Sequence, residues 1–377
     1  MRYDSLQVGR AIAALAVVVH HAVGRARAAG IGNSLADWYT NGYFGVDYFF
    51  VLSGFIIAYS ISRSRGGWRE FALHRVFRIY PVFWLVFLAS LAGAAILPAL
   101  LGKDLDYSIP ELGKAMLLIY QDIPDARGNP PVVRIAWTLQ HEMLFYSVAT
   151  LFLLSRRLGT AAAGMLLAGA VALSLTGPQG GAWDFLLSPM HFEFALGVLS
   201  FQVHRKLPPW PAAAVVAIGA LGFVLAPRTL PLIEDPASWT RAVDLGIPLS
   251  LIVGGFAAFD FAAIGSWCRL YRSPAGSALL RIGNWSYALY LVHYPIVLLF
   301  LKLLAVCIPH ATAGYLAYLA GVVLCSVAVA GALTMRFERP LQDWLKMTFL
   351  VPEQVHAPAP SPGASAAVGE SITADRG

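Results

Sequence analysis

The stretch Leu6–Gly24, LQVGRAIAALAVVVHHAVG, decides the fold class of this chain. It is apolar over a length that crosses a bilayer as an α-helix, yet it contains Arg10 and His21. Ionisable side chains at such depth are costly unless they face a protein interior or a water-filled path. The stretch therefore predicts a membrane helix with a polar, functional face.

Arg10 and His21 point to the same side of that helix. They are eleven residues apart, so the helix makes three turns plus about 20° between them and rises about 16 Å. A cation near one membrane surface and an imidazole further along the same face predict a channel for an anionic molecule with a reactive end. The alternative is that Arg10 only extends to the inner headgroups and that His21 caps the helix end. The neighbouring His20 points about 100° away and receives no role.

The composition indicates that the whole chain, and not only this first segment, is a membrane protein. Of 377 residues, 58% are hydrophobic and 13% are charged, whereas a soluble domain carries about 25% charged residues. The apolar residues form long blocks, and none of them alternates at period two. We therefore predict an all-α polytopic bundle of about ten transmembrane helices, near residues 8–24, 44–62, 76–100, 135–154, 159–176, 186–203, 210–227, 243–263, 285–303 and 313–335.

Basic residues set the expected topology. Lys and Arg collect in every second connection, which places both termini in the cytoplasm, at 63–78, 156–157, 205–206, 269–281 and 336–346. The net charge of +6 is then explained by topology, and no nucleic-acid partner is expected. A signal peptide cleaved after Ala28 would remove Arg10 and His21 and would break this alternation.

The C-terminal tail and the three cysteines complete the expected organisation of the chain. The Pro-, Ala-, Ser- and Gly-rich tail 351–377 is expected to be disordered, which leaves residues 1–350 as the membrane domain. The three cysteines form no C-x-x-C pair, so neither a disulfide framework nor a metal site is expected; they are Cys268, Cys307 and Cys325.

Two carboxylates lie within expected spans. Asp47 falls in the first turn of YFGVDYFFVLSGFII (43–57), and Glu142 lies in WTLQHEMLFY (137–146), about 10 Å into its span. An unpaired carboxylate at such depth needs a partner or a function. The alternatives are a charge partner at a helix N-terminus for Asp47 and a structural ion pair for Glu142. Packing is the expected role of the Ser53-Gly54 pair. His141, next to Glu142, receives no interpretation.

Two further stretches carry polar groups at regular spacing. Arg75 and Arg78 in HRVFRIYPVFW (74–84) share a helix face and could clamp phosphate oxygens, or they could be a plain cytoplasmic anchor. Ser286, Tyr290 and His293 in GNWSYALYLVHYP (283–295) form one polar stripe. This stripe fits either ligand binding or a hydrogen-bond network in the interior.

Several catalytic signatures are missing from the sequence. There is no G-x-S-x-G elbow, no G-x-x-x-x-G-K-[ST] loop and no H-E-x-x-H. Serine esterase chemistry, phosphoanhydride hydrolysis and zinc proteolysis therefore have no support.

Taken together, these stretches resemble the acyltransferase 3 family of integral membrane acyltransferases. The likeness extends from about Leu6 to Leu341, and each motif is weak alone while their order and spacing are specific. Within this family, the sequences of the motifs are most similar to those of the exopolysaccharide acetyltransferase branch. The matching pieces are Arg10 and His21 with ten residues between them, FGVDYFFVLSGFII, RVFRIYP, WTLQHEMLFY, SPMHFEFALGVL, SYALYLVHYP and FERPL.

This resemblance implies transfer of an acyl group, usually acetyl, from cytoplasmic acyl-CoA (acetyl-CoA) to a hydroxyl of a cell-surface glycan or its lipid-linked precursor. It implies a multi-pass protein of the bacterial inner membrane, and it matches Arg10 and His21 to the arginine and histidine of the family. Some relatives carry an extracytoplasmic hydrolase-like domain. This chain is expected to complete the transfer within the membrane domain or with a separate partner.

A mechanism follows as a hypothesis. The phosphates of acyl-CoA would lie on Arg10, Arg75 and Arg78, and His21 would be the general base. Either Asp47 or Glu142 would hold the other imidazole nitrogen, and the oxyanion donors would be Ser286, Tyr290 or His293. Direct transfer and an acyl-enzyme both remain open. The rival class is a glycan-lipid or proton-coupled transporter, although the sequence has no two related halves.

Overall fold

Helices make up the secondary structure of the protein. The computed structural model describes residues 3–31, 42–64, 67–96, 107–121, 132–177, 179–226, 238–262, 271–307 and 312–350. No strand occurs among these residues, which confirms the all-α class. The tail 351–377, expected to be disordered, and Cys268 lie outside them.

The chain forms long helices joined by short ones. The first half contains α1 (Asp4–Ala28), α3 (Phe44–Arg63), α4 (Gly67–Ile96), α6 (Ile109–Met116), η1 (Arg134–Ala136), α7 (Trp137–Leu154) and α8 (Arg156–Thr176). The second half contains α9 (Ala182–Leu186), α10 (Met190–Val203), η2 (His204–Lys206), α11 (Pro209–Leu225), α13 (Trp239–Phe261), α15 (Pro274–Asn284), α16 (Ser286–Cys307), α17 (Thr312–Leu333), η3 (Thr334–Glu338) and α18 (Arg339–Phe349).

Eight helices of the described residues are long and apolar enough to cross a membrane. The two other expected spans are present as shorter or more polar helices. α11 has 17 residues, and α7 has 18 residues but carries Gln140, His141 and Glu142 in its first half. A polar helix of this kind is tolerated when its polar face points into the bundle.

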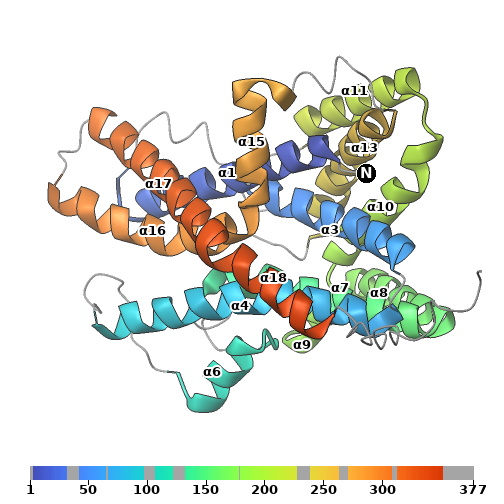
Figure 1. Cartoon of the computed structure of the whole chain (residues 1–377), viewed down its shortest axis with the longest axis horizontal. Coiled ribbons are helices and arrows are strands. Elements are labelled where there is room, and N and C mark those ends of the chain that lie inside the picture. Colours follow the sequence, from blue (N-terminus) through green and yellow to red (C-terminus); the bar gives the residue numbers. More distant parts are fainter. Residues whose placement is uncertain are drawn as a thin grey trace, which may run out of the picture.

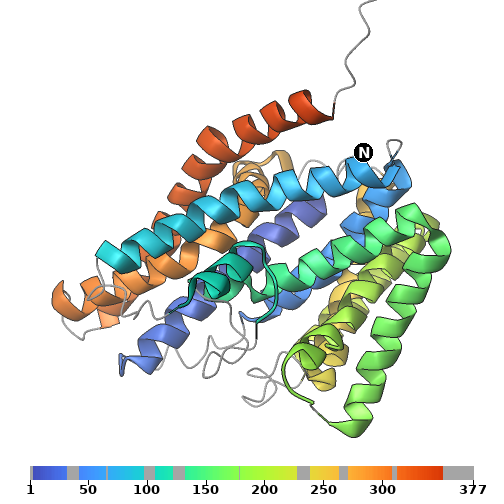
Figure 2. The ribbon, with the colours of Figure 1, turned by 90° about the horizontal axis from the view of Figure 1, so that it is seen from below.

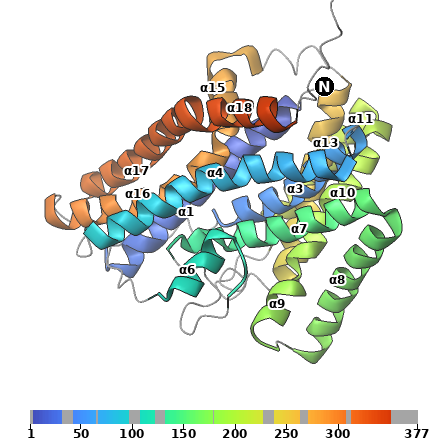
Figure 3. The ribbon, with the colours of Figure 1, turned by 60° about the horizontal axis from the view of Figure 1, so that its bottom comes forward.

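Helix α1 runs through the middle of the bundle (Figure 1). It contacts α15, α16 and α17 on one side and α3 and α13 on the other. Its many alanines let both groups pack closely, and each group has its own hydrophobic core. Val17 and Val18 belong to the core with α4, α7, α16 and α17, whereas Leu6 and Ala13 belong to the core with α3 and α13. Figure 3 shows α4 and α7 running along α1 and α3.

Glycine allows the closest helix contact. A Cβ on Gly54 of α3 would lie 2.0 Å from the Phe194 carbonyl oxygen, and a Cβ on Gly197 of α10 would lie 1.8 Å from the Val51 carbonyl oxygen. The two backbones therefore touch, as small residues permit in membrane helices. This confirms the packing role that the sequence indicates for Gly54.

The chain changes direction at a π-helical turn between α17 and α18. Residues Thr334–Glu338 form this turn, and α18 then bends away from α17 (Figure 2) and contacts α4. Glu338 accepts hydrogen bonds from Thr334 Oγ1 at 3.0 Å and from Gln342 Nε2 at 3.2 Å. The FERPL motif thus forms the bend that brings α18 over the start of α4.

Candidate functional site

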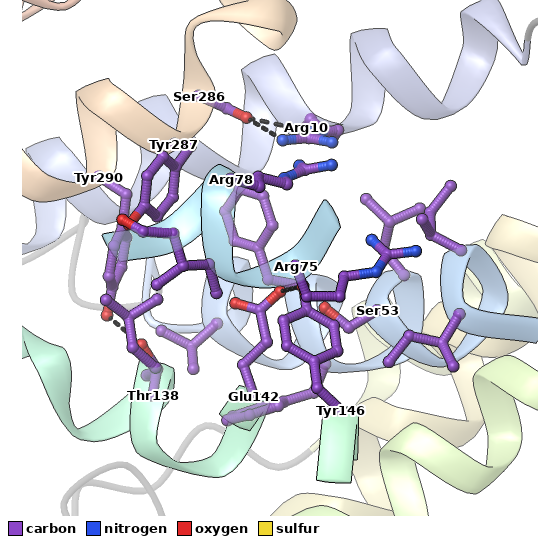
Figure 4. A pocket seen from close by; sticks show the side chains of 18 residues that line it. Arg10, Ser53, Arg75, Arg78, Thr138, Glu142, Tyr146, Ser286, Tyr287 and Tyr290 are labelled. Carbon is purple, nitrogen blue, oxygen red and sulfur yellow. Dashed lines mark hydrogen bonds between the residues drawn. The ribbon is translucent and has the colours of Figure 1, made fainter. Parts of the chain in front are cut away.

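A cavity of about 820 Å³ lies between α1, α3, α4, α7 and α16. We call it the central cavity; Figure 4 shows the side chains that line it. Its wall is mainly apolar on the α3 side, where Ser53 is the polar exception among the described residues, and the other sides carry most of the polar side chains. Six of the residues predicted from the sequence line it: Arg10, Arg75, Arg78, Glu142, Ser286 and Tyr290.

None of the three arginines of the central cavity hydrogen-bonds to a carboxylate of a described residue. Arg10 donates from Nε and Nη2 to Ser286 Oγ, at 3.0 and 2.8 Å. Arg75 donates to the Ser60 hydroxyl, and its Nε is a buried donor without a partner. Its guanidinium also lies over the rings of Phe71 and Tyr146, at 4.9 and 5.1 Å. These guanidiniums keep hydrogen-bonding capacity for a bound anion.

Arg78 and Glu142 complete the charge pattern. Arg78 makes no hydrogen bond or ion pair with any residue that the structure describes, and it lines the cavity (Figure 4). Glu142 accepts a hydrogen bond from the Tyr146 hydroxyl, and its charge acts on both Arg10 and Arg78. The lining thus holds three guanidiniums and one carboxylate, which favours a ligand with several negative charges.

A second cavity continues from the first toward one end of the bundle. This α4–α18 cavity has about 940 Å³ and shares Arg75 and Arg78 with the central cavity. Its other lining residues come mainly from the end of α3 and the start of α4, with Gln342 and Lys346 from α18. The two guanidiniums therefore stand where the two cavities meet.

His21 pairs with His293 beside the central cavity. Neither ring lines that cavity, but His293 packs against Tyr290, which does, with ring centres 5.7 Å apart. His21 Nδ1 lies 3.1 Å from the Val17 carbonyl oxygen and 3.2 Å from His293 Nε2. His293 Nδ1 lies 3.2 Å from the Leu289 carbonyl oxygen.

These contacts assign one set of tautomers. A carbonyl oxygen only accepts, so His293 carries its hydrogen on Nδ1 and offers the lone pair of Nε2. His21 then carries its hydrogen on Nδ1, shared between Val17 and His293. Nε2 of His21 keeps its lone pair and makes no hydrogen bond with a described residue. This is the state that a general base requires.

Asp47 is placed elsewhere. Its two carboxylate oxygens accept from Nε and Nη2 of Arg241 on α13, at 2.8 and 3.0 Å. Both side chains are almost fully buried, and Glu193 of α10 is buried beside them. Asp47 is therefore part of an ion-pair cluster between α3, α10 and α13.

The expected orientation of His21 by a carboxylate needs correction. Asp47 binds Arg241 and Glu142 binds Tyr146, so neither hydrogen-bonds to His21. The structure gives that position to His293 and the Val17 carbonyl. Sequence reasoning missed Arg241 and Glu193, although both are charges in apolar helices. Their position as charges in apolar helices is the signal that could have marked them, although it does not say which charge each one meets.

His141, which received no interpretation from the sequence, packs in an aromatic cluster with Phe50, Trp137 and His191. His20 stacks edge-on against His21 and Tyr43. Within the described ranges, no group of three or more His, Cys, Asp or Glu residues could hold a metal ion.

Comparison with known proteins places the chain in a family. Residues 3–331 match the acyltransferase domain of the acyltransferase 3 family. The chain is 29% identical to acyltransferase MdmB of Streptomyces mycarofaciens over 328 residues, which are 79% of each chain. It is 29% identical over 188 residues to the exopolysaccharide production protein ExoZ of Rhizobium meliloti (strain 1021), covering 49% of this chain and 58% of ExoZ. No solved structure matches the chain.

The chain therefore belongs to the acyltransferase 3 family, as its motifs indicate. The family match and the eight apolar helices together make it a multi-pass membrane protein and an O-acyltransferase. This decides between the enzyme and the transporter that the sequence left as alternatives.

Proposed function

We propose that this enzyme transfers an acyl group, acetyl in the first instance, from cytoplasmic acyl-CoA to a hydroxyl of a cell-surface polysaccharide or of its lipid-linked precursor. The acceptor class is supported by the name of ExoZ, an exopolysaccharide production protein. The setting that we propose is a bacterial inner membrane, because cytoplasmic acyl-CoA must reach one face and the glycan the other.

The observation that carries this proposal is the set of incompletely paired arginines in the central cavity. Arg78 has no hydrogen-bond partner among the described residues and Arg75 has an unpaired buried Nε. Acyl-CoA carries several phosphates on a long flexible arm, so its phosphates match Arg75 and Arg78 where the two cavities meet. Arg10, deeper and held by Ser286, would neutralise the remaining charge.

The basic ends of α3, α4 and α18 support a cytoplasmic entrance. The α4–α18 cavity is lined by Arg63 and Lys346 in addition to its two shared arginines. Basic residues concentrate on the cytoplasmic side of membrane proteins. The donor would therefore enter through this cavity, and its thioester would extend toward Tyr290 and the histidine pair.

The chemical step follows from the tautomers of the pair. His21 Nε2 takes the proton from the acceptor hydroxyl, whose oxygen forms a bond to the thioester carbonyl carbon. The carbon–sulfur bond then breaks, and the proton on His21 passes to the leaving thiolate. His293 accepts the Nδ1 hydrogen of His21 throughout and so stabilises the imidazolium.

Of the expected oxyanion donors, Tyr290 fits best. Ser286 is seven residues from His293, about 10 Å along the helix, so it cannot act on the carbonyl that His21 serves. Tyr290 is one turn from His293 and lines the central cavity. Its single hydroxyl hydrogen is donated to the Ile135 carbonyl oxygen at 2.8 Å, with Thr138 Oγ1 also 2.8 Å away. Tyr290 would therefore donate to the oxyanion by exchanging the Ile135 contact.

The test uses purified full-length protein in nanodiscs with labelled acetyl-CoA and glycan acceptors. Wild type is expected to place the label on glycan and to release CoA in equal amount. His21→Ala should lower the turnover about 10² to 10⁴-fold, because general base catalysis is lost, with unchanged acetyl-CoA affinity. His20→Ala, which removes the adjacent ring, is the matched control. Near-normal transfer by His21→Ala would contradict the proposal, as would wild type that moves no label.

A further inference from the structure

We propose that a third cavity, between α4, η1 and α16, binds the acceptor and selects one that carries an anionic group. This inference rests on the proposed acyl transfer and names the class of its second substrate. We call the space the α4–α16 cavity. It has about 390 Å³, which includes space open to solvent.

The histidine pair contacts one lining residue of the central cavity, Tyr290, and one of the α4–α16 cavity, Tyr294. The two cavities follow one another along the same face of α16: Tyr290 lines the central cavity, and Tyr294, one turn later, lines the α4–α16 cavity. The rings of His21 and Tyr294 have centres 5.5 Å apart, and those of His293 and Tyr294 are 6.5 Å apart. The base therefore lies between two cavities, and a hydroxyl in one can meet a thioester that arrives from the other.

The lining combines an apolar wall with a few polar groups. Val133, Pro295 and Leu298 supply apolar surface, and Ser90, Arg134 and Tyr294 supply hydrogen-bonding groups. Sugar rings present apolar faces and hydroxyl edges, so they match such a lining. Val132, in the same lining, has φ 64°, and backbone strain in a β-branched residue is typical of ligand sites.

Positive charge without a carboxylate partner gives the site its selectivity. Arg134 makes no ion pair or hydrogen bond with a described residue. Arg25 donates to the Tyr294 hydroxyl, and its guanidinium also lies 5.2 Å from the centre of that ring. Among the described residues that line the cavity, none is acidic. Two cations beside one small cavity favour a phosphate or carboxylate on the acceptor, carried either by an acidic sugar or by a diphosphate-linked lipid.

The experiment measures acyl transfer to three acceptors. They differ in whether they carry a negative charge and in which chemical group carries it. They are a neutral oligosaccharide, the same oligosaccharide with a uronic acid, and the neutral oligosaccharide on a polyprenyl diphosphate. The variants are Arg134→Gln, Arg134→Lys and Ser90→Trp, which fills the cavity. Arg157→Gln, an exposed arginine at the start of α8, is the matched control.

We expect Arg134→Gln to raise KM for the charged acceptor about tenfold, as loss of one charge-assisted contact predicts. KM for acetyl-CoA and for the neutral acceptor should not change, and Arg134→Lys should restore most of the affinity. The acceptor that shows the effect identifies the source of the charge. Ser90→Trp should lower transfer to every acceptor, with unchanged acetyl-CoA binding.

Two results would overturn the inference. An equal effect of Arg134→Gln on charged and neutral acceptors would remove the charge selectivity. Unchanged transfer by Ser90→Trp would remove the cavity from the acceptor path. Both differ from failure of the proposed function itself, in which wild type acylates none of the three acceptors.

Discussion

Two buried arginine sites of this protein differ in what faces the guanidinium. At the first, Arg241 of α13 binds both oxygens of Asp47, with Glu193 buried beside the pair. At the second, Arg75 and Arg78 of α4 face a cavity that Glu142 also lines, but neither arginine makes an ion pair with a described residue. Both sites place cations within the bundle, where charge is costly. Among the described residues, only the first holds its counter-charge in a direct bidentate pair.

The difference separates structural charge from charge kept for a ligand. A guanidinium with a bidentate carboxylate partner has its charge and its hydrogen bonds satisfied by the fold. A guanidinium with hydroxyl partners and an adjacent cavity keeps unsatisfied donors, which an anion can complete. We therefore expect changes at Asp47 to act on stability and changes at Arg75 and Arg78 to act on donor binding.

The largest effect is expected for Asp47→Ala. It leaves the Arg241 guanidinium beside Glu193 without its bidentate partner, and breaking a buried pair from one side costs about 3–5 kcal/mol of unfolding free energy. Thermal unfolding and the yield of monodisperse protein measure it. Asp343→Ala, at a side chain 72% exposed, is the control and should have little effect. A stable Asp47→Ala protein without activity would instead restore Asp47 to the catalytic machinery.

A smaller effect is expected for the double variant Arg75→Gln with Arg78→Gln. Each guanidinium contributes about 1.5 kcal/mol through a charge-assisted contact to phosphate, so Kd for acetyl-CoA should rise about 100-fold. The unfolding temperature should stay close to that of wild type. Isothermal titration in nanodiscs measures the binding, and Arg69→Gln, an exposed arginine of the same helix, is the control. Unchanged donor affinity would return both arginines to a membrane-anchor role.

The smallest effect is expected for Ser286→Ala. It removes the hydroxyl that accepts two hydrogen bonds from Arg10 but leaves the guanidinium free to turn toward the ligand. We expect a loss of about 1 kcal/mol in donor binding, or roughly fivefold in Kd. Ser277→Ala on the exposed face of α15 is the comparison. A loss as large as that of the double arginine variant would show that Ser286 itself touches the donor.

Much of the architecture could be predicted from periodicity and length. The all-α bundle and the packing role of Gly54 each follow from rules that act within one helix. The shared channel face expected for Arg10 and His21 is not found, because Arg10 lines the central cavity and His21 lies beside it. The stripe Ser286, Tyr290 and His293 is also a local pattern. The structure divides it, because Ser286 binds Arg10 and His293 binds His21 while Tyr290 lines the cavity between them.

Rules that act within one helix could not predict which side chains of different helices pair with one another. The sequence shows that Asp47 is a charge in a membrane helix, but its partner is 194 residues away on α13. The same holds for His21 and His293, which are 272 residues apart. The spacing within a helix gives the direction of a side chain, whereas the order in which helices pack decides which side chain it meets.

What the sequence determined by itself was which segments enter the membrane and which face of each carries charge, because length, hydropathy and the 3.6-residue repeat are properties of a single segment. Only the tertiary structure decided that His293 orients His21, that Asp47 neutralises Arg241 and that three arginines share one cavity. These pairings depend on helices brought together from distant parts of the chain, and the cost of an unpaired buried charge then selects the arrangement.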